Sequence, residues 1–321
     1  MTISSRVTCL YVLAACFALL SSFPALAVPN PVKVSGYLQT RYVNDQAASY
    51  RSDFMVRRAR VKLSGSITED VSVNVSFDVA MSTLLKDTYV QWAKGPSRFA
   101  LGQQKVPFGF EIPQSDADRL SLERDKVFSI FPSTYDRGVV FNYTPSRPGI
   151  PVTFTAAALN GNGEASDNNN AKNLAFRAQA KPKWGGIGAS YYTGNFATTP
   201  PAPPVTTAAV RTGFDFQYDR QPVGWHGEFV GGRASGKSIQ GWYLEGIYSV
   251  PKKPGVVFVR QSAFDPNTDL ASDDYRRTLI GYVLHLDSDD ATRLTFQYGF
   301  VTDKKTGGSD NAFGVQFQVK Y

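Results

Sequence analysis

The chain has 321 residues, with 34 Lys and Arg against 27 Asp and Glu, for a formal net charge of +7. Aromatic residues make up 13% and charged residues only 19%, which excludes a disordered chain, because such chains lack aromatics and carry dense charge. The 27 Gly and 19 Pro argue against a helical bundle, since both weaken helix interiors. No run beyond the leader approaches the roughly 18 apolar residues of a membrane-spanning helix, but composition leaves a transmembrane β-barrel open.

The N-terminus, residues 1–27, is predicted to be a secretory signal peptide with a small-residue cleavage site that ends at Ala27. Both cysteines, Cys9 and Cys16, lie within it, so no disulfide or thiolate metal site is expected in the mature chain. Lipidation at Cys16 is the alternative. It is disfavoured because it would leave an apolar stub behind the lipidated residue and ignore the better site at Ala27.

Period-two alternation of apolar and polar residues is the main signal in the mature sequence. In the stretch 71–79 every odd position is apolar and every even position is polar, and 313–321 shows the same pattern. The alternation predicts sixteen strands: 31–43, 53–68, 70–80, 85–94, 97–104, 138–145, 150–159, 172–182, 184–194, 209–219, 223–233, 238–250, 255–264, 274–287, 290–302 and 310–321.

The connections between these strands are predicted to alternate between short turns and longer or more polar loops. An even-stranded outer-membrane barrel has short periplasmic turns and longer external loops, with both termini in the periplasm. The longest connection, 105–137, is then the third external loop. Loops of this length are usually functional or disordered, and its apolar residues, including Phe128, Ile130 and Phe131, argue against disorder.

The direction in which the apolar face of the strands points distinguishes a soluble barrel from a membrane barrel. A barrel of sixteen strands encloses more space than side chains can fill, so we expect the apolar face to contact lipid and the polar face to line water. We therefore predict an all-β protein, a 16-stranded antiparallel transmembrane β-barrel over residues 28–321, in the bacterial outer membrane after export and signal-peptide cleavage.

Several stretches resemble the phosphate-selective porin O and P family. They are 32–39, 54–65, 85–90, 101–111, Glu123-Arg124, Asp136-Arg137-Gly138, 160–163 and 189–194. The resemblance implies a homotrimeric porin whose third external loop folds into the lumen and whose arginines and lysines guide anions. Loop 105–137 is accordingly expected to constrict the lumen rather than cover its mouth, with constriction residues Lys105, Arg119, Glu123, Arg124 and Arg137.

The polar face carries more bases than acids. Phase assignment places twelve basic side chains there (Lys33, Arg41, Arg58, Arg60, Lys62, Arg98, Arg177, Lys181, Arg211, Arg277, Arg293, Lys320) and six acidic ones (Asp78, Asp87, Asp215, Asp219, Glu228, Glu245). Rings of Arg and Lys select anions in pores. The predicted anion path consists of Arg41, Arg58, Arg60, Lys62, Arg98, Lys105, Arg177, Arg211 and Arg293. Arg57 is out of phase with Arg58 and Arg60, which indicates a strand end or a bulge.

Charge within the loop limits the prediction of phosphate specificity. Loop 105–137 holds five basic and six acidic residues, so many arginines of the wall could be paired and could pin the loop. We therefore expect a general anion preference, with a phosphate or pyrophosphate site built on Arg58, Arg60 and Lys105 as the narrower hypothesis. A small-solute porin without phosphate selectivity and a plugged barrel acting as an adhesin or enzyme are the alternatives.

Other motifs carry no function in this context. Residues 231–238 match the phosphate-loop pattern of nucleotide hydrolases, but a strand follows where that motif needs a helix, so a hairpin turn is predicted. With only two histidines and no nucleophile motif, no catalytic residue, metal site or cofactor is expected. The expected partners are outer-membrane lipid, small anions such as phosphate, and two further copies of the chain, and no nucleic acid.

Overall fold

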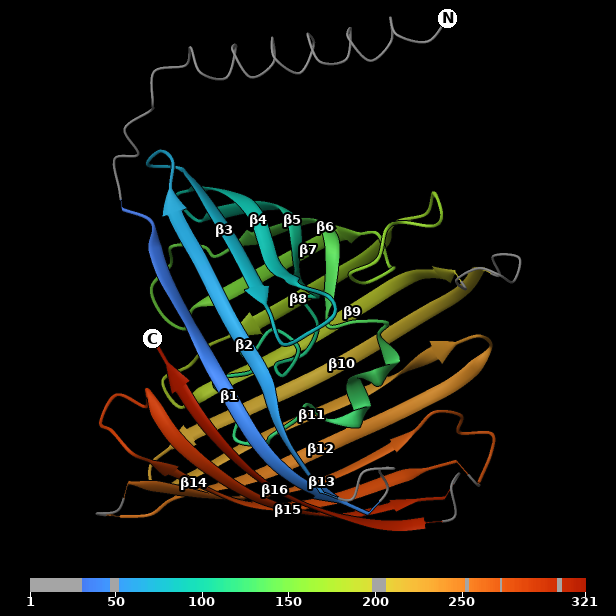
Figure 1. The fold of residues 1–321 in the computed structure, drawn as a ribbon. Coiled ribbons are helices and arrows are strands. Elements are labelled where there is room, and N and C mark those ends of the chain that lie inside the picture. Colours follow the sequence, from blue (N-terminus) through green and yellow to red (C-terminus); the bar gives the residue numbers. More distant parts are fainter. Residues whose placement is uncertain (1–30, 47–51, 198–205, 252–253, 272, 305–307) are drawn as a thin grey trace, which may run out of the picture.

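The computed structural model describes residues 31–46, 52–197, 206–251, 254–271, 273–304 and 308–321, so the predicted signal peptide lies outside the described residues. Within these ranges, sixteen antiparallel strands form one closed barrel (Figure 1). The strands are β1 (Lys33–Asp45), β2 (Asp53–Ser66), β3 (Val71–Asp78), β4 (Leu85–Lys94), β5 (Ser97–Lys105), β6 (Tyr135–Tyr143), β7 (Val152–Leu159), β8 (Asn173–Ala180), β9 (Gly185–Ala197), β10 (Thr206–Arg220), β11 (Val223–Ala234), β12 (Lys237–Ser249), β13 (Gly255–Asp265), β14 (Tyr275–His285), β15 (Thr292–Asp303) and β16 (Gly308–Lys320).

The barrel closes where the first strand pairs with the last. Leu38 of β1 lies opposite Val319 of β16 and, on its other side, opposite Ala59 of β2. Every other strand pairs with its neighbours in sequence, so no backbone edge remains unpaired, as the bilayer requires. The predicted fold class is confirmed, and the predicted strand bounds agree with the observed ones to within a few residues.

The connection between β5 and β6 is shorter than predicted. The β5–β6 ladder continues as far as the pair Lys105 and Tyr135, so Lys105 and Arg137 lie on strands and not in the loop. The connecting residues are 106–134, which we call the long segment. It contains one short 3-10 helix, η1 (Lys126–Ile130), capped by Asp125, whose side chain accepts a hydrogen bond from the Val127 amide.

The predicted alternation of loop lengths is only partly correct. The connection between β11 and β12, on the side where the alternation predicts longer or more polar loops, is a turn of two residues, Ser235 and Gly236, both with positive φ. Such turns match the twist of a hairpin, which is why small or polar residues stand there. The phosphate-loop pattern at 231–238 is therefore a β-hairpin.

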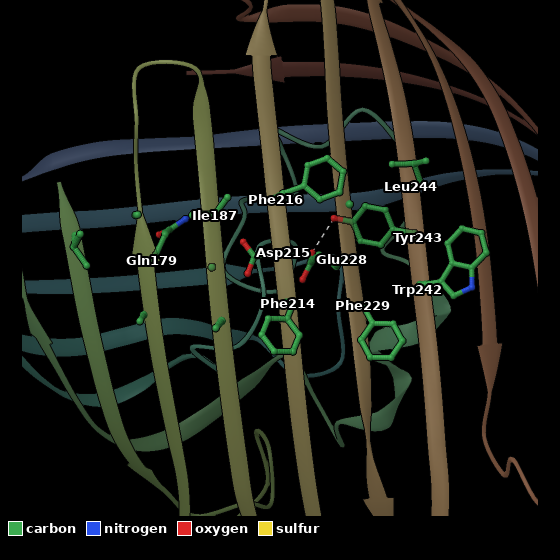
Figure 2. A pocket seen from close by; sticks show the side chains of 16 residues that line it. Gln179, Ile187, Phe214, Asp215, Phe216, Glu228, Phe229, Trp242, Tyr243 and Leu244 are labelled. Carbon is green, nitrogen blue, oxygen red and sulfur yellow. Dashed lines mark hydrogen bonds between the residues drawn. The ribbon is translucent and has the colours of Figure 1, made fainter. Parts of the chain in front are cut away.

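The two faces of the strands differ as the alternation predicts. Figure 2 shows the apolar rings of Phe214, Phe229 and Trp242 alternating with Asp215 and Glu228 on neighbouring strands. Phe214 is 61% exposed, whereas Asp215 and Glu228 are buried. Among the residues described, no helix is long and apolar enough to cross a bilayer.

One expectation about the interior is wrong. The buried face is not uniformly polar, because Val140, Leu159 and Val230 lie on it and form an apolar cluster with Phe108 and Val127 of the long segment. A second, smaller cluster is centred on Phe258 and Leu279. These wall positions are apolar because apolar side chains of the long segment pack against them.

Candidate functional site

The long segment contacts strands on opposite sides of the barrel. The Glu123 carboxylate accepts a hydrogen bond from Arg58 of β2 at 3.0 Å, and the Ile130 carbonyl accepts one from Arg211 of β10. β2 and β10 are eight places apart in a closed ring of sixteen strands, so they face each other. Further contacts reach β9 through Ser190 and β16 through Gln318.

Three arginines converge on Glu123. Arg41 of β1 and Arg57 and Arg58 of β2 place guanidinium nitrogens 2.7, 2.6 and 3.0 Å from its carboxylate oxygens. Arg57 contributes because the β1–β2 register shifts between Gln39 and Thr40, which leaves Arg57 as an extra residue in β2. Of the two predicted alternatives, a strand end or a bulge, the bulge is observed, and it turns a third arginine toward the same carboxylate.

A second carboxylate, Asp116, binds four arginines. Arg124 and Arg119 of the long segment lie 2.7 and 2.9 Å away, while Arg58 and Arg60 of β2 each approach to 3.6 Å. Asp116 and Glu123 together therefore face six arginines. This cluster, Arg41, Arg57, Arg58, Arg60, Arg119 and Arg124 with Asp116 and Glu123, is called the arginine cluster below, and its formal charge is positive.

Both carboxylates of the arginine cluster stay ionised. Burial alone would raise the pKa of Glu123, but Arg58, Arg41 and Arg57 outweigh it and hold that pKa well below its usual range. Arg124, Arg119 and Arg58 likewise hold the pKa of Asp116 well below the usual value, against the effect of burial. Because both pKa values are lowered, the carboxylates stay charged at neutral pH, and the bonds from the long segment to β1 and β2 persist there.

Further ion pairs attach the segment to β13 and β14 through residues on either side of Asp116 and Glu123. Arg260 of β13 bonds Glu111 at 2.7 Å and Glu245 of β12 at 2.8 Å. Arg277 of β14 bonds Asp125 at 2.8 Å. The carboxylate of Glu228 has no arginine partner among the residues that the structure describes. It accepts the Phe110 and Glu111 amides at 2.8 and 2.6 Å and the Tyr243 hydroxyl at 2.8 Å (Figure 2 shows the last).

Three more of the predicted path residues, besides Arg41, Arg58 and Arg60, are bound to the wall or to the long segment. Arg177 forms a two-pronged pair with Asp215 at 2.6 and 3.0 Å. The guanidinium of Arg211 lies 4.7 Å from the ring centre of Phe131 and 4.6 Å from that of Phe196. Arg293 donates to the Arg119 carbonyl at 2.8 Å and approaches Asp290 at 3.8 Å.

The remaining predicted residues differ in accessibility. Lys62 and Arg98 are exposed, Arg98 next to the turn between β4 and β5. Lys105 donates to the Gln114 carbonyl, and Arg137 donates to Gln103 at 3.0 Å. Arg60, Lys62 and Lys105 line one cavity, and Arg98 and Arg137 are not among the residues that line it.

Sequence reasoning missed Arg260, and Lys86, which pairs with Glu164 at 2.6 Å. Arg260 follows the apolar run 256–259, where alternation gives no phase. Lys86 lies in β4 next to a register shift between β3 and β4 that displaces the phase. The sequence did offer one signal for Arg260, a single arginine within an apolar strand. A charge buried there needs a partner of opposite charge, which indicates an ion pair.

Comparisons with known proteins agree with this architecture. The sequence model of the phosphate-selective porin O and P family matches residues 35–219. Trimeric OmpT from Vibrio cholerae superposes with a TM-score of 0.65 at 11% identity, covering 91% of this chain and 99% of OmpT. An anion-selective porin from Comamonas acidovorans gives 0.65 at 14% identity, with 91% and 99% covered. DcaP from Acinetobacter baumannii gives 0.61 at 12% identity, with 90% and 97% covered.

A comparison with curated proteins found no match. The closed antiparallel barrel of sixteen strands is the architecture of outer-membrane porins, which are channels and not enzymes. The family match covers more than half of the sequence, so the chain belongs to the phosphate-selective porin O and P family.

Proposed function

We propose that this porin is a water-filled, anion-preferring diffusion channel that works as a homotrimer, and that the long segment lies inside the barrel and narrows it. The observation that carries the proposal is the arginine cluster, where two carboxylates of the long segment meet four arginines of β1 and β2, while the same segment also bonds β10 on the opposite side. A segment outside a closed barrel could not reach inward-facing side chains of both β2 and β10. The place of η1 within the outline of the strands in Figure 1 is consistent with this.

Charge supports anion preference over phosphate specificity. Each carboxylate of the arginine cluster is shared among several guanidinium groups, so positive charge remains to attract anions, and low-dielectric walls strengthen its field. Arginine forks also suit phosphate, but Asp116 and Glu123 already occupy several of the donors here. Phosphate or pyrophosphate preference is therefore the narrower part of the proposal.

The reversal potential of the purified trimer in a planar bilayer under a salt gradient tests the anion preference. We expect anions to carry most of the current. Cation preference, or no conductance, would overturn the proposal.

Submillimolar phosphate added to the chloride solution tests the narrower part of the proposal, the preference for phosphate or pyrophosphate. A specific site predicts a saturable block that disappears when Arg58, Arg60 and Lys105 are replaced by Ala, and an unchanged current refutes it.

A disulfide is expected to form between cysteines replacing Val127 and Gly241. A Cβ added to Gly241 would lie 2.8 and 3.2 Å from the two methyl carbons of Val127, which is close enough for a disulfide. The measurement is the loss of free thiols on mild oxidation of the double variant. Cysteines at Val127 and at Leu244, on the exposed face of the same strand, are the control and should stay reduced. Free thiols in both would contradict the position of the segment.

Replacing Phe214 by Arg is expected to lower the free energy of unfolding in lipid vesicles by about 2–4 kcal/mol, because a cation would enter the bilayer core. Phe214 is 61% exposed near the middle of β10. Denaturant titration of the folded barrel measures the effect. Phe214→Leu keeps the site apolar and should cost much less, and equal stability of both variants would argue against lipid contact.

A further inference from the structure

A polar cavity lies beside the arginine cluster. Its volume is about 450 Å³, and it is bounded by β1, β2, β4, the end of β5 and residues 113–118 of the long segment. A volume of this size is ordinary for a small organic ligand and much larger than one inorganic anion needs. The cavity is also accessible, since Lys62 and Tyr321 on its wall are exposed.

Cationic groups with free donors face this cavity. Lys62 forms no ion pair with any residue the structure describes. Lys105 has no carboxylate partner either, since its ammonium bonds the Gln114 carbonyl and lies 5.8 Å from the Tyr135 ring centre.

The carboxylates around the cavity are already occupied. Asp116 belongs to the arginine cluster, and Asp118 pairs with Lys320 at 3.1 Å. Asp87 accepts the Tyr135 hydroxyl at 3.3 Å and lies 3.9 Å from Arg60. The unsatisfied groups on the wall are therefore cations, so a bound ligand gains most by presenting an acceptor of negative charge.

Aromatic rings complete the lining. Tyr37, Tyr89 and Tyr321 all border the cavity, and the Tyr37 ring lies 5.6 Å from the Arg60 guanidinium. Tyrosine offers an apolar ring face beside a polar hydroxyl, and aromatic pairs gain beyond simple burial. Phosphate, with no apolar surface, would use none of these rings.

We propose that this cavity binds an aromatic carboxylate of the benzoate class. Lys62 and Lys105 hold the carboxylate, and the tyrosines receive the ring. The inference rests on the proposed anion channel, since the ligand would be a solute that passes through that channel. It names an organic anion, whereas the description of the family names phosphate.

Calorimetry of the full, detergent-solubilised protein tests the inference independently of conductance. The probes are benzoate, cyclohexanecarboxylate, which has the same charge and no π-system, and inorganic phosphate. We expect benzoate to bind about five-fold more tightly than cyclohexanecarboxylate, as one aromatic contact provides. Lys62→Gln with Lys105→Gln should weaken benzoate about ten-fold or more, as lost charge-assisted bonds do.

Matched variants separate the contribution of the tyrosine rings from that of the lysine charges. Tyr89→Leu should erase the preference for benzoate over cyclohexanecarboxylate, while Lys94→Gln, an exposed lysine that does not line the cavity, should change nothing. Tighter binding of phosphate than of benzoate, or full benzoate binding in the double lysine variant, overturns the inference. Bilayer conductance distinguishes the failures, because a chain that conducts chloride but binds no benzoate refutes only this inference, whereas a chain without conductance refutes the channel.

Discussion

Replacing Glu123 by Gln is expected to raise the anion-to-cation permeability ratio about four-fold or more. The substitution keeps an oxygen acceptor for Arg41, Arg57 and Arg58, but it removes the negative charge that these three arginines share. A unit charge about 5 Å from a passing ion is worth roughly 0.8 kcal/mol even in bulk water, and more beside a low-dielectric wall. The reversal potential under a salt gradient measures the change.

The matched control for this prediction is Glu69→Gln. Glu69 is exposed in the turn between β2 and β3 and has the same charge, so any general effect of a lost carboxylate appears there as well. An equal shift in both variants, or no shift in Glu123→Gln, would mean that permeating ions do not pass the arginine cluster.

Replacing Arg260 by Met is expected to lower the free energy of unfolding by about 3–5 kcal/mol, the largest stability effect we predict. Arg260 is the charged partner of both Glu111 and Glu245, and these three side chains are at most 4% exposed. Removing one partner of a buried ion pair leaves uncompensated charge, which costs far more than the pair itself contributes. Denaturant titration in detergent, followed by the electrophoretic mobility of the folded barrel, measures the loss.

Two further variants test whether uncompensated buried charge causes the predicted loss of stability. Arg276→Met removes an arginine whose side chain is 69% exposed, and its cost should stay below about 1 kcal/mol. The triple variant Arg260→Met, Glu111→Gln, Glu245→Gln removes the charges together and should recover most of the lost stability. If the triple variant were as unstable as the single one, packing of Arg260 against the Tyr243 ring, 4.3 Å away, would be the larger contribution.

Alternation predicted the barrel well because each strand faces two solvents of different polarity. Val71, Val73 and Val75 lie on one face of β3, and the polar residues between them lie on the other. The rule fails where residues on both faces are apolar, as in the run 256–259 of β13. There the inward ring of Phe258 fills the space above Gly281, where an added Cβ would lie 2.2 Å from the ring. Arg260, two residues further along, therefore had no assignable phase.

The site could be predicted only in part. Glu123 and Arg124 are predicted from the family resemblance together with their place in a long loop, and the balance of charges in that loop predicts pairing of wall arginines with loop carboxylates. Which arginine meets which carboxylate depends on the path of residues 106–134, which have no repeating period. The convergence of Arg41, Arg57 and Arg58 on Glu123 also requires a bulge, and out-of-phase Arg57 was its one visible sign.

The apolar cluster that joins Phe108 and Val127 to Leu159 and Val230 has a consequence for engineering. Deleting residues 106–134 from the chain would expose the apolar wall residues of this cluster, including Leu159 and Val230, to the barrel interior. Liquid water is unstable in narrow apolar constrictions and tends to evaporate from them. A shortened protein would thus gain diameter while losing wettability, and its conductance would rise by less than the added cross-section suggests.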